Sequence, residues 1–427
     1  MSSPAESFSV NRVESAGYGA FDRFLRARLL ERLGQLSGGT LTVLDAHGSQ
    51  RLGKSSGPDP LHINLRIHSP AFYRAAASHG SVGAGESYMA GEWDCDDLVG
   101  LVRLLVRNRD LLDGVEGGLA KFGGIALKAW HSLRRNTRLG SRENIAAHYD
   151  LGNDLFRLFL DDNLMYSSAI FADANDTLEI ASQRKLERIC QKLELKPSDH
   201  LVEIGTGWGG MALHAARHYG CRVTTTTISK EQHALASERV AAAGLGDRVT
   251  VLLQDYRDLA GQYDKLVSIE MIEAIGHQYL DTYFKQCAAL LKPDGLALIQ
   301  AITIEDHRYE QALASVDFIQ RHIFPGSFIP CVTAMTESAA RAGELRLLNL
   351  EDIGPSYALT LNHWRQRFFA NLDKVRALGY DERFVRMWEF YLCYCEGGFI
   401  ERSISDVHLL FGRSDNRRSQ YLPGMVG

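Results

Sequence analysis

Residues 199–210 read DHLVEIGTGWGG and combine an apolar run with a glycine-rich turn. The run ends at Glu203 and Ile204, and glycines then stand at positions 205, 207, 209 and 210. The following residues, MALHAARHYG, have helical spacing and stop at a glycine. A strand, a glycine-rich turn and a helix in this order form the setting in which a loop holds a nucleotide-like ligand. We therefore predict a ligand-binding turn at residues 205–210.

The residues on both sides of this turn alternate between helical and extended patterns. An amphipathic helix, LEIASQRKLERICQKLEL, precedes it, and four further strands follow as CRVTTTTIS, RVTVLLQDY, YDKLVSIEM and LALIQAITI. Two helical segments, EQHALASERVAAAGL and YLDTYFKQCAALLKPDG, lie among these strands. Such alternation is typical of an α/β fold with a mostly parallel, Rossmann-like sheet and right-handed crossovers.

The spacing of the turn is E-x-G-x-G-x-G rather than the G-x-G-x-x-G of dinucleotide-binding folds. No Lys-Ser or Lys-Thr pair follows it, which excludes a phosphate-binding P-loop. Glu203 can instead face the ammonium or sulfonium group of a ligand with a cationic amino-acid end. The turn resembles the first motif of class I S-adenosylmethionine (SAM) methyltransferases.

The next two strands end in polar residues suited to the rest of such a ligand. Thr227, Ser229 and Gln232 offer neutral hydrogen bonds in place of the acid that usually binds ribose hydroxyls. Tyr256, within QDYRD, suits the edge and face of an adenine. Ser229 can equally cap the following helix, with Gln232 completing a capping box, and the two roles are compatible.

Six blocks of sequence resemble the cyclopropane fatty acid synthase family, whose relatives include mycolic acid modifying methyltransferases. They are NIAAHYDLGNDLFRLFLDDNLMYSSAIF (residues 144–171), LVEIGTGWGG, TISKEQ, LLQDYRDL, MIEAIG and YLCYCEGGF. The resemblance implies SAM-dependent transfer of a methyl or methylene carbon to the cis double bond of unsaturated phospholipid acyl chains. A cyclopropane is then the expected product. A methylene- or methyl-branched chain is the alternative.

The same resemblance implies a cofactor site from three parts of the chain. The residues that match the family at this site are Tyr166, Ser167, Val202, Glu203, Ile204, Gly205, Thr206, Gly207, Trp208, Gly209, Gly210, Thr227, Ile228, Ser229, Lys230, Glu231, Gln232, Tyr256 and Arg257. The sequence shows no spacing typical of metal ligands, so we expect no metal.

The resemblance also implies an anion pocket, in which the family binds bicarbonate to take the proton lost from the transferred methyl group. Glu273 and Tyr357 match the family there. Ser168 replaces a cysteine, Gln300 replaces a histidine, and Ala274 stands where the family has another histidine. Ser168 and Gln300 can hydrogen-bond an anion, but neither titrates near neutral pH. Without bicarbonate, we expect Glu273 to take the proton, with a pKa raised by apolar surroundings.

Two further predictions concern apolar and sulfur-containing residues. Cys395 matches a C-terminal cysteine of the family, and a buried packing thiol is the alternative to a catalytic one. A carbocation on the acyl chain needs an apolar, aromatic tunnel, for which ordinary core packing is the alternative. The aromatic candidates near the first block are His148, Tyr149, Phe156, Phe159 and Tyr166.

We predict four segments along the chain: a flexible N-terminus at 1–20, a lipid-handling α+β domain at 21–116, a basic linker at 117–142 and the methyltransferase domain at 143–427. The helical pattern AFDRFLRARLLERLGQL begins the second segment and suits either a domain helix or a membrane-surface helix. Segment 117–142 contains six cations and no acid, which suits either a solvated linker or contact with anionic lipid headgroups.

Composition narrows the remaining function classes. The 427 residues carry a formal charge of −5, which argues against nucleic acid as a partner and against an RNA methyltransferase. The 7 cysteines lack the spacing of a disulfide framework, and no signal peptide or membrane span is evident. We therefore expect a cytoplasmic protein, peripheral at the inner face of the cytoplasmic membrane. A small-molecule methyltransferase, a lipid-binding protein with an inactive methyltransferase domain and a homodimer remain open.

Overall fold

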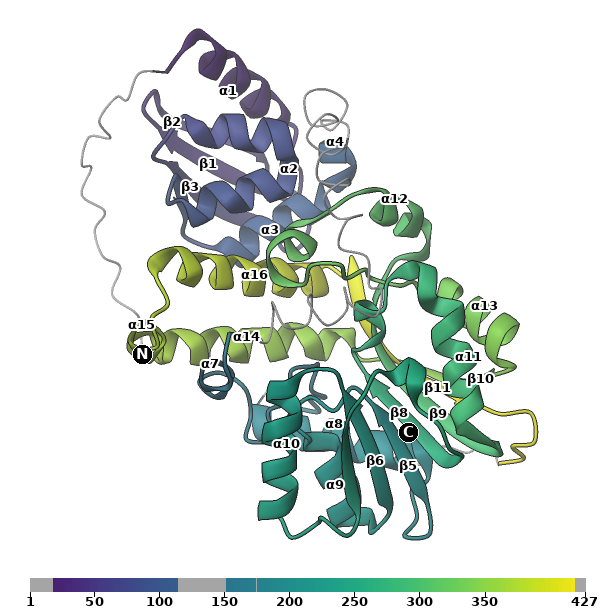
Figure 1. The fold of residues 1–427 in the computed structure, drawn as a ribbon. Helices are drawn as coiled ribbons and strands as arrows, with labels where there is room; N and C mark the ends of the chain where they lie inside the picture. Colours follow the sequence, from purple (N-terminus) through teal and green to yellow (C-terminus); the bar gives the residue numbers. More distant parts are fainter. Residues whose placement is uncertain (1–17, 114–150, 174, 419–427) are drawn as a thin grey trace. The chain divides into compact units, whose positions relative to one another are not determined.

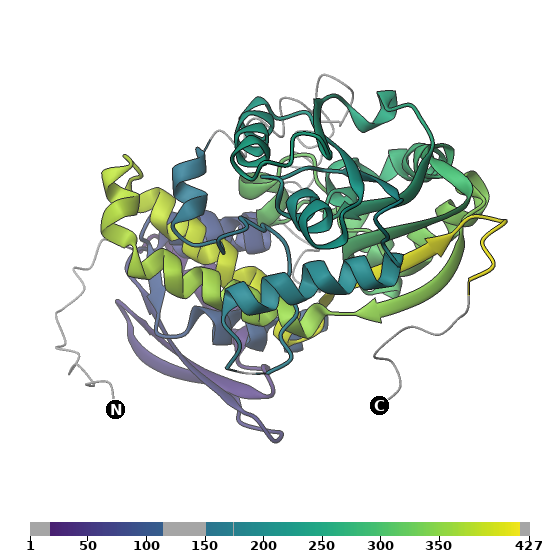
Figure 2. The ribbon, with the colours of Figure 1, turned by 90° about the horizontal axis from the view of Figure 1, so that it is seen from below.

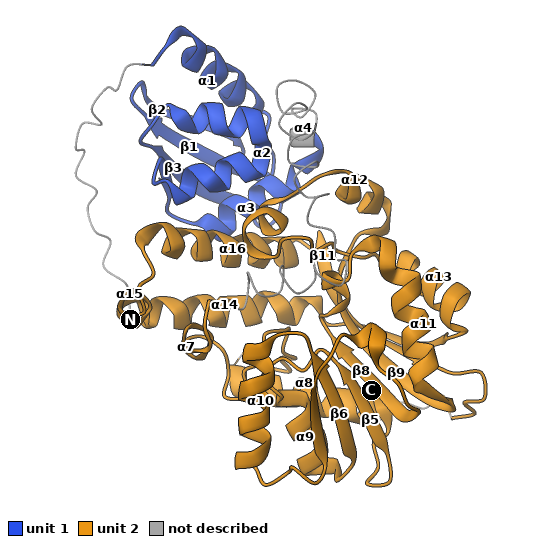
Figure 3. Cartoon of the chain, viewed as in Figure 1, with its two compact units in different colours: residues 1–123 blue, residues 124–427 orange. Residues whose placement is uncertain are grey.

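The computed structural model describes residues 18–113, 151–173 and 175–418. The chain forms two compact units, residues 1–123 and 124–427 (Figure 3). Most of the flexible N-terminus and all of the basic linker predicted from the sequence lie outside the described residues. The division into four segments therefore stays a prediction.

The first unit contains a four-stranded sheet in the order β2-β1-β3-β4, in which β1 and β3 run parallel. Side chains of β3 alternate between buried and solvent-facing, as in a sheet with one packed face. The elements are α1 (Ala20–Leu33), β1 (Gly39–Asp45), β2 (Gly48–Lys54), β3 (Leu61–Ile67), α2 (Ala71–Met89), β4 (Trp93–Cys95), α3 (Leu98–Arg107) and α4 (Arg109–Asp113). This mixture agrees with the α+β character predicted for the region.

Helix α1 packs within the first unit through part of its apolar surface. Leu25 and Leu33 are buried, whereas Phe21 and Phe24 are each 55% exposed. Arg26 anchors the helix because its Nε lies 2.5 Å from the buried carboxylate of Asp45. The helix is therefore a domain helix that also carries two exposed aromatic rings.

The second unit is built on a seven-stranded sheet in the order β10-β11-β9-β8-β5-β6-β7 (Figure 1). The five strands predicted from the sequence are present and mutually parallel. Antiparallel β11 and β10 extend the sheet at one side and were not predicted. The strands are β5 (His200–Ile204), β6 (Arg222–Thr227), β7 (Val249–Leu253), β8 (Tyr263–Ile269), β9 (Leu291–Ile304), β10 (Arg346–Asp352) and β11 (Ile404–Gly412).

Helices cover both faces of this sheet. Leu201 packs with α8 (Leu178–Leu193), α9 (Gly210–Tyr219) and α10 (Lys230–Ala242). Its neighbour Val202 points to the other face and packs with α11 (Leu280–Leu290) and α13 (Val332–Gly343). The helix predicted to continue to residue 295 ends at Leu290, because Pro293 cannot donate a helical hydrogen bond. The unit therefore has the three-layer arrangement expected of a doubly wound α/β fold.

The remaining helices include two long ones, α14 (Gly354–Ala370) and α16 (Glu382–Ile400), which lie side by side (Figure 1, Figure 2). The shorter elements are α7 (Asn153–Arg157), α12 (Tyr309–Ala314), α15 (Leu372–Ala377), 3-10 turns at Tyr256–Asp258, Ile272–Ala274, His277–Tyr279 and Asp306–Arg308, and a π-helical turn at Ile319–Ile323. Within the described residues, none of the helices combines the length and apolar character needed to cross a bilayer.

Candidate active site

The loops after β5, β6 and β7 meet at the carboxyl edge of the parallel sheet. The N–H groups of Gly205 and Thr206 both donate to the carbonyl of Thr226, each at 3.0 Å. The N–H of Gln254 donates to the carbonyl of Thr227, also at 3.0 Å. The chain reverses its strand order between β5 and β8, and ligands of such folds bind in the crevice beside that point.

The glycine-rich turn presents open backbone at this edge. Gly207 has φ +52°, and a Cβ placed there would have no heavy atom within 4 Å. Gly205 has φ +99°, and its Cβ would approach the Met271 side chain at 3.2 Å. Both conformations favour glycine, and the space at Gly207 allows a ligand to approach the main chain.

Glu203 lies in β5, two residues before this turn, and is only 2% exposed. Its Oε2 atom is buried and has no hydrogen-bond partner among the described residues. Burial raises the pKa of Glu203 to about 8. At this pKa the carboxyl group of Glu203 is neutral at pH 7 in the absence of a ligand. A cation beside its unpartnered oxygen favours ionisation of the group, so the position suits the cationic end of SAM.

The residues after β6 form a small hydrogen-bonded group. Ser229 caps α10 by accepting from the N–H of Gln232 at 3.3 Å, so its predicted capping role is present. The Gln232 side chain does not follow the predicted box, because its Oε1 accepts from the Thr227 hydroxyl at 2.8 Å. This bond directs the amide nitrogen of Gln232 away from Thr227. Ile228 lies between them in the chain, and Lys230 and Glu231 are exposed in the first turn of α10.

The residues after β7 place the ring of Tyr256 beside the guanidinium of Arg257. Arg257 makes two bonds to Asp255, at 2.9 and 2.6 Å. Its guanidinium lies 5.7 Å from the ring centre of Tyr256. Burial raises the pKa of the Tyr256 hydroxyl above its ordinary value. The pair therefore offers a planar, neutral ring and a fixed cation of the kind that suits an adenine.

The segment Tyr166–Ser168 connects with several distant elements. The Tyr166 and Tyr391 hydroxyls share a hydrogen bond at 3.0 Å. The Ser167 hydroxyl accepts from the amine of Lys185 at 2.7 Å, and Lys185 is fully buried in α8. The Ser168 N–H donates to Glu270 at 2.8 Å.

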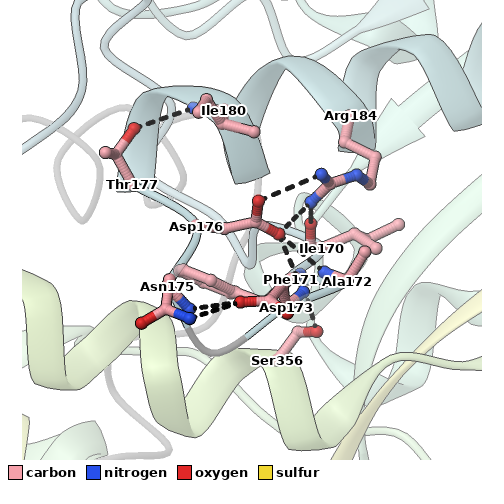
Figure 4. A network of polar contacts seen from close by, with 10 residues as sticks. All are labelled: Ile170, Phe171, Ala172, Asp173, Asn175, Asp176, Thr177, Ile180, Arg184 and Ser356. Carbon is pink, nitrogen blue, oxygen red and sulfur yellow. Dashed lines mark hydrogen bonds and ion pairs between the residues drawn. The ribbon is translucent and has the colours of Figure 1, made fainter.

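A polar network holds the residues that follow this segment (Figure 4). Asp176 accepts from the N–H groups of Ala172 and Asp173 and forms an ion pair with Arg184 at 2.5 Å. Arg184 lowers the pKa of Asp176 well below its ordinary range. The Phe171 N–H donates to Ser356 on α14. These contacts fasten the segment to α8 and α14.

The structure brings together three residues of the predicted anion pocket, but around a residue that was not predicted. The Glu270 carboxylate accepts from the Ser168 N–H at 2.8 Å and the Gln300 amide at 2.9 Å, both on Oε1. Its Oε2 accepts from the Tyr357 hydroxyl at 2.6 Å. Burial raises the pKa of the Tyr357 hydroxyl well above its ordinary value, so this hydroxyl remains a donor.

Glu273 lies three residues beyond Glu270, in the turn that also contains Ala274. Its Oε1 accepts from the Ile302 N–H at 2.6 Å, and its Oε2 is buried without a partner among the described residues. Burial, followed by the negative charge of Glu270, raises the pKa of Glu273 to about 8. The sequence analysis also expected a raised pKa for Glu273. The value of about 8 lies above neutral pH.

Two other predicted features have ordinary structural environments. Cys395 is half-buried in α16, and burial raises the pKa of its thiol, with Asp317 adding to the effect. A thiol with a raised pKa is a poor nucleophile at neutral pH, which favours the packing alternative. Phe156 and Phe159 are fully buried and pack against Trp388. His148 and Tyr149 lie outside the described residues.

Sequence reasoning missed several buried polar residues beneath the pocket. Asp406 and His408, on β11, are fully buried and both contact Gln300. Lys185 is also fully buried. The only available signal for Lys185 was its place in the apolar spacing of α8, four residues before Ile189.

The fold and the glycine-rich edge define a class I SAM methyltransferase. Residues 136–409 match the family described as mycolic acid cyclopropane synthetase. The chain belongs to this family, which confirms the resemblance in the sequence.

Similar proteins span most of the chain. A tuberculostearic acid methyltransferase of Mycobacterium tuberculosis is 42% identical over 349 residues, covering 80% of this chain and 81% of that protein. The cyclopropane-fatty-acyl-phospholipid synthase of Escherichia coli is 37% identical over 358 residues, covering 82% and 88%. A mycolic acid cyclopropane synthase solved with SAH and CTAB is 31% identical, with a TM-score of 0.60, covering 64% of this chain and 98% of that one.

Proposed function

We propose that the protein transfers a one-carbon unit from SAM to the cis double bond of unsaturated acyl chains in membrane phospholipids, with a cyclopropane as product. The observation that carries the proposal is the link between the two parts of the site. Ser167 and Ser168 are consecutive, and Tyr166 and Ser167 match the family's cofactor site, whereas Ser168 donates to a carboxylate in the anion pocket. Similarity to the Escherichia coli phospholipid synthase over 82% of the chain supports the substrate class.

SAM supplies an electrophilic methyl group to the alkene. We assign its cationic end to Glu203, its ribose to Thr227 and Gln232, and its adenine to the ring of Tyr256. The acyl π bond is itself the nucleophile, so the protein needs no nucleophilic side chain. The raised pKa of the Cys395 thiol agrees with this absence of a nucleophile. The tasks of the protein are to exclude water and to accept one proton.

Bicarbonate, which the family resemblance implies, does not fit the anion pocket of this chain. The Ser168 N–H, the Gln300 amide and the Tyr357 hydroxyl already donate to the Glu270 carboxylate. A second anion at this place would lack donors and would face the charge of Glu270. We therefore assign no step to bicarbonate.

A methylene- or methyl-branched chain is the second candidate product. The 42% identity to a tuberculostearic acid methyltransferase favours it. Ring closure takes a proton from the added methyl group directly, whereas a hydride shift to the cationic carbon before that loss gives an exocyclic methylene. Loss of a proton from a neighbouring chain carbon instead gives a methyl-branched alkene. Whether a hydride shift precedes the proton loss, and which carbon faces the acceptor, thus decide between ring closure and a branch.

A direct test supplies the purified protein with methyl-labelled SAM and vesicles of cis-unsaturated phospholipid. Vesicles with saturated chains are the matched control. We expect label in the acyl chains of the unsaturated lipid alone. SAM binding without any labelled lipid would support an inactive lipid-binding protein instead. Label in an added small molecule or RNA, with none in lipid, would support the other methyltransferase classes.

Access to acyl chains also requires a membrane surface, and we propose peripheral attachment at the inner face of the cytoplasmic membrane. Segment 117–142 contributes six cations, each worth about 1 kcal/mol near an anionic surface. Neutralising Arg134, Arg135 and Arg138 together should release the protein from anionic vesicles in a flotation assay. The matched control neutralises three exposed cations of the second unit, Arg217, Arg222 and Lys285. Equal flotation of both variants would mean that the segment is only a linker. Light scattering on the same protein without vesicles tests separately for a homodimer.

A further inference from the structure

Glu270 is held in an uncommon backbone conformation at the end of β8. Its φ is +45°, a region that residues with side chains rarely adopt. Its N–H donates to the Gln300 carbonyl at 2.9 Å, which ties the turn to β9. Residues kept in such a conformation are concentrated at functional sites, because the surrounding structure must hold them there.

The side chain of Glu270 ends among three donors. They are the Ser168 N–H at 2.8 Å, the Gln300 amide at 2.9 Å and the Tyr357 hydroxyl at 2.6 Å. Two donors are shared on one oxygen and the third lies on the other, so both oxygens of the carboxylate are bound. Hydrogen bonds to an ionised carboxylate favour its charged form.

These donors belong to the residues that the family resemblance assigned to an external bicarbonate. A carboxylate has the same planar O–C–O group and charge as bicarbonate. In this chain the pocket therefore contains its anion already, attached to the backbone at Glu270. Of the two replaced residues, Gln300 donates to this carboxylate through its side-chain amide. Ser168 donates through its main-chain N–H, while its hydroxyl donates to the Ala169 carbonyl.

Asp406 and His408, which both contact Gln300, indicate which carboxyl group of the cluster carries a proton. His408 Nε2 lies 3.2 Å from Gln300 Oε1, which leaves the Gln300 amide nitrogen to face both Glu270 and Asp406. Asp406 is fully buried, and burial with the charge of Glu270 raises its pKa well above the ordinary range. Within the part of the chain that the structure describes, Asp406 accepts from the Gln300 amide alone, at 2.7 Å, whereas Glu270 accepts from three donors. The proton shared by this pair therefore belongs to Asp406, and Glu270 is the anion.

Neighbouring charges support the same assignment. Burial raises the pKa of Glu270, and the hydrogen bonds from Tyr357 and Ser168 together with the buried amine of Lys185 oppose this shift. Glu273, with a pKa of about 8, holds its proton at neutral pH and so is not available as an acceptor. Glu270 is the group in this cluster that combines a negative charge with a full set of donors.

We propose that the Glu270 carboxylate replaces bicarbonate in this protein and accepts the proton that the transferred methyl group loses. This proposal rests on the proposed function and differs from the expectation that Glu273 takes the proton. In the step, a C–H bond of the added methyl group breaks and its electron pair forms the second C–C bond to the cationic carbon. The proton moves to a Glu270 oxygen and returns to water before the next turnover.

Three variants test the proposal. Glu270→Gln keeps the size of the side chain and removes its charge. Glu270→Gly suits the positive φ and vacates the place between Ser168, Gln300 and Tyr357. Glu273→Gln is the matched control, because it neutralises the neighbouring acid and leaves Glu270 in the pocket. SAM affinity and melting temperature verify that each variant is folded.

Turnover is measured on cis-unsaturated phospholipid vesicles in buffer freed of carbon dioxide, with and without added bicarbonate. We expect the wild-type rate to be independent of bicarbonate and Glu270→Gln to lose at least about 100-fold. Bicarbonate should restore Glu270→Gly to within about tenfold of the wild type and should not increase turnover of Glu270→Gln or Glu273→Gln. A wild-type rate that requires bicarbonate, or a Glu270→Gln rate equal to the wild type, would overturn the proposal.

Calorimetry with formate provides a measurement that does not depend on activity. Formate should bind Glu270→Gly and should not bind the wild type or Glu273→Gln. Formate binding to the wild type as tightly as to Glu270→Gly would overturn the replacement of bicarbonate by Glu270. If formate binds Glu270→Gly alone but no protein modifies lipid, the carboxylate replacement stands and the proposed acyl-chain reaction fails.

Discussion

The two halves of the site are built from very different stretches of sequence. The edge that we propose for the cofactor, called the cofactor edge below, consists of three short segments, each at the end of a parallel strand: 202–210, 227–232 and 256–257. The anion pocket draws single residues from positions 168, 270, 300, 357 and 406. The first half depends on local geometry, whereas the second depends on tertiary structure that brings distant residues together.

Because of this difference, we expect the two halves to respond differently to substitution. A turn with open backbone tolerates changes in its neighbours but not in its glycines. A buried network of carboxylates and donors is sensitive at every member, because a lost partner leaves a polar group unsatisfied in the interior.

The buried acid of the cofactor edge should make stability depend on pH. Glu203 has a folded pKa of about 8 against an ordinary value of 4.5. Between these values the folded protein keeps a proton that the unfolded chain releases, so stability falls as pH rises from about 5 to 8. We expect Glu203→Gln to be free of this loss, a difference of roughly 3–5 kcal/mol across the window.

Melting temperatures of the wild type and Glu203→Gln, measured without SAM from pH 5 to pH 8, check this prediction. The exposed Glu231→Gln is the control and should follow the wild type. Parallel curves for the wild type and Glu203→Gln would show that Glu203 titrates normally.

Gly205→Val should damage SAM binding directly. The substitution demands a positive φ from a β-branched residue and directs its Cβ at Met271, 3.2 Å away. We expect SAM affinity to fall at least about 100-fold, equivalent to roughly 3 kcal/mol. Calorimetry measures the affinity, and Gly246→Val, at an open position with ordinary φ, is the control. Unchanged affinity in Gly205→Val would place the cofactor elsewhere.

Tyr357→Phe should affect the anion pocket and spare the cofactor edge. It removes the donor to Glu270 Oε2, a bond of 2.6 Å to a charged group. Turnover should fall about 10- to 100-fold while SAM affinity stays within about twofold of the wild type. If both quantities fall together, the two halves of the site are not separable in the way that their structures indicate.

Thr227→Val should have the smallest effect. It removes the hydroxyl that donates to Gln232 at 2.8 Å, so the Gln232 amide loses its fixed orientation. We expect SAM affinity to fall about fivefold, equivalent to roughly 1 kcal/mol. Thr250→Val, on the exposed face of β7, is the control. An equal loss in both variants would mean that Gln232 does not need this bond to hold the ligand.

The sequence predicted the parts of the molecule in which structure follows from neighbouring residues. The five parallel strands, the glycine turn and the Ser229 cap were all evident from local spacing. Strands β10 and β11 were not, because an antiparallel pair added late in the chain carries no alternation with helices.

The anion pocket shows the limit of prediction most clearly. Glu273, Tyr357, Ser168 and Gln300 entered through resemblance, and the resemblance could not indicate what lies among them. Glu270 was included in a predicted strand, YDKLVSIEM, without a role. Only the tertiary structure shows its carboxylate between Ser168, Gln300 and Tyr357.

A mass spectrum of the lipids from a host that expresses the protein tests the central claim most directly. We predict acyl chains that are heavier than their unsaturated precursors by one CH₂ unit and that have lost the double bond. We expect no such chains in hosts with Glu270→Gln or an empty vector. A gain of one CH₂ unit with a retained double bond would select the methylene branch over the ring. Lipids identical to those of the empty vector, from a host with folded protein that binds SAM, would contradict the account.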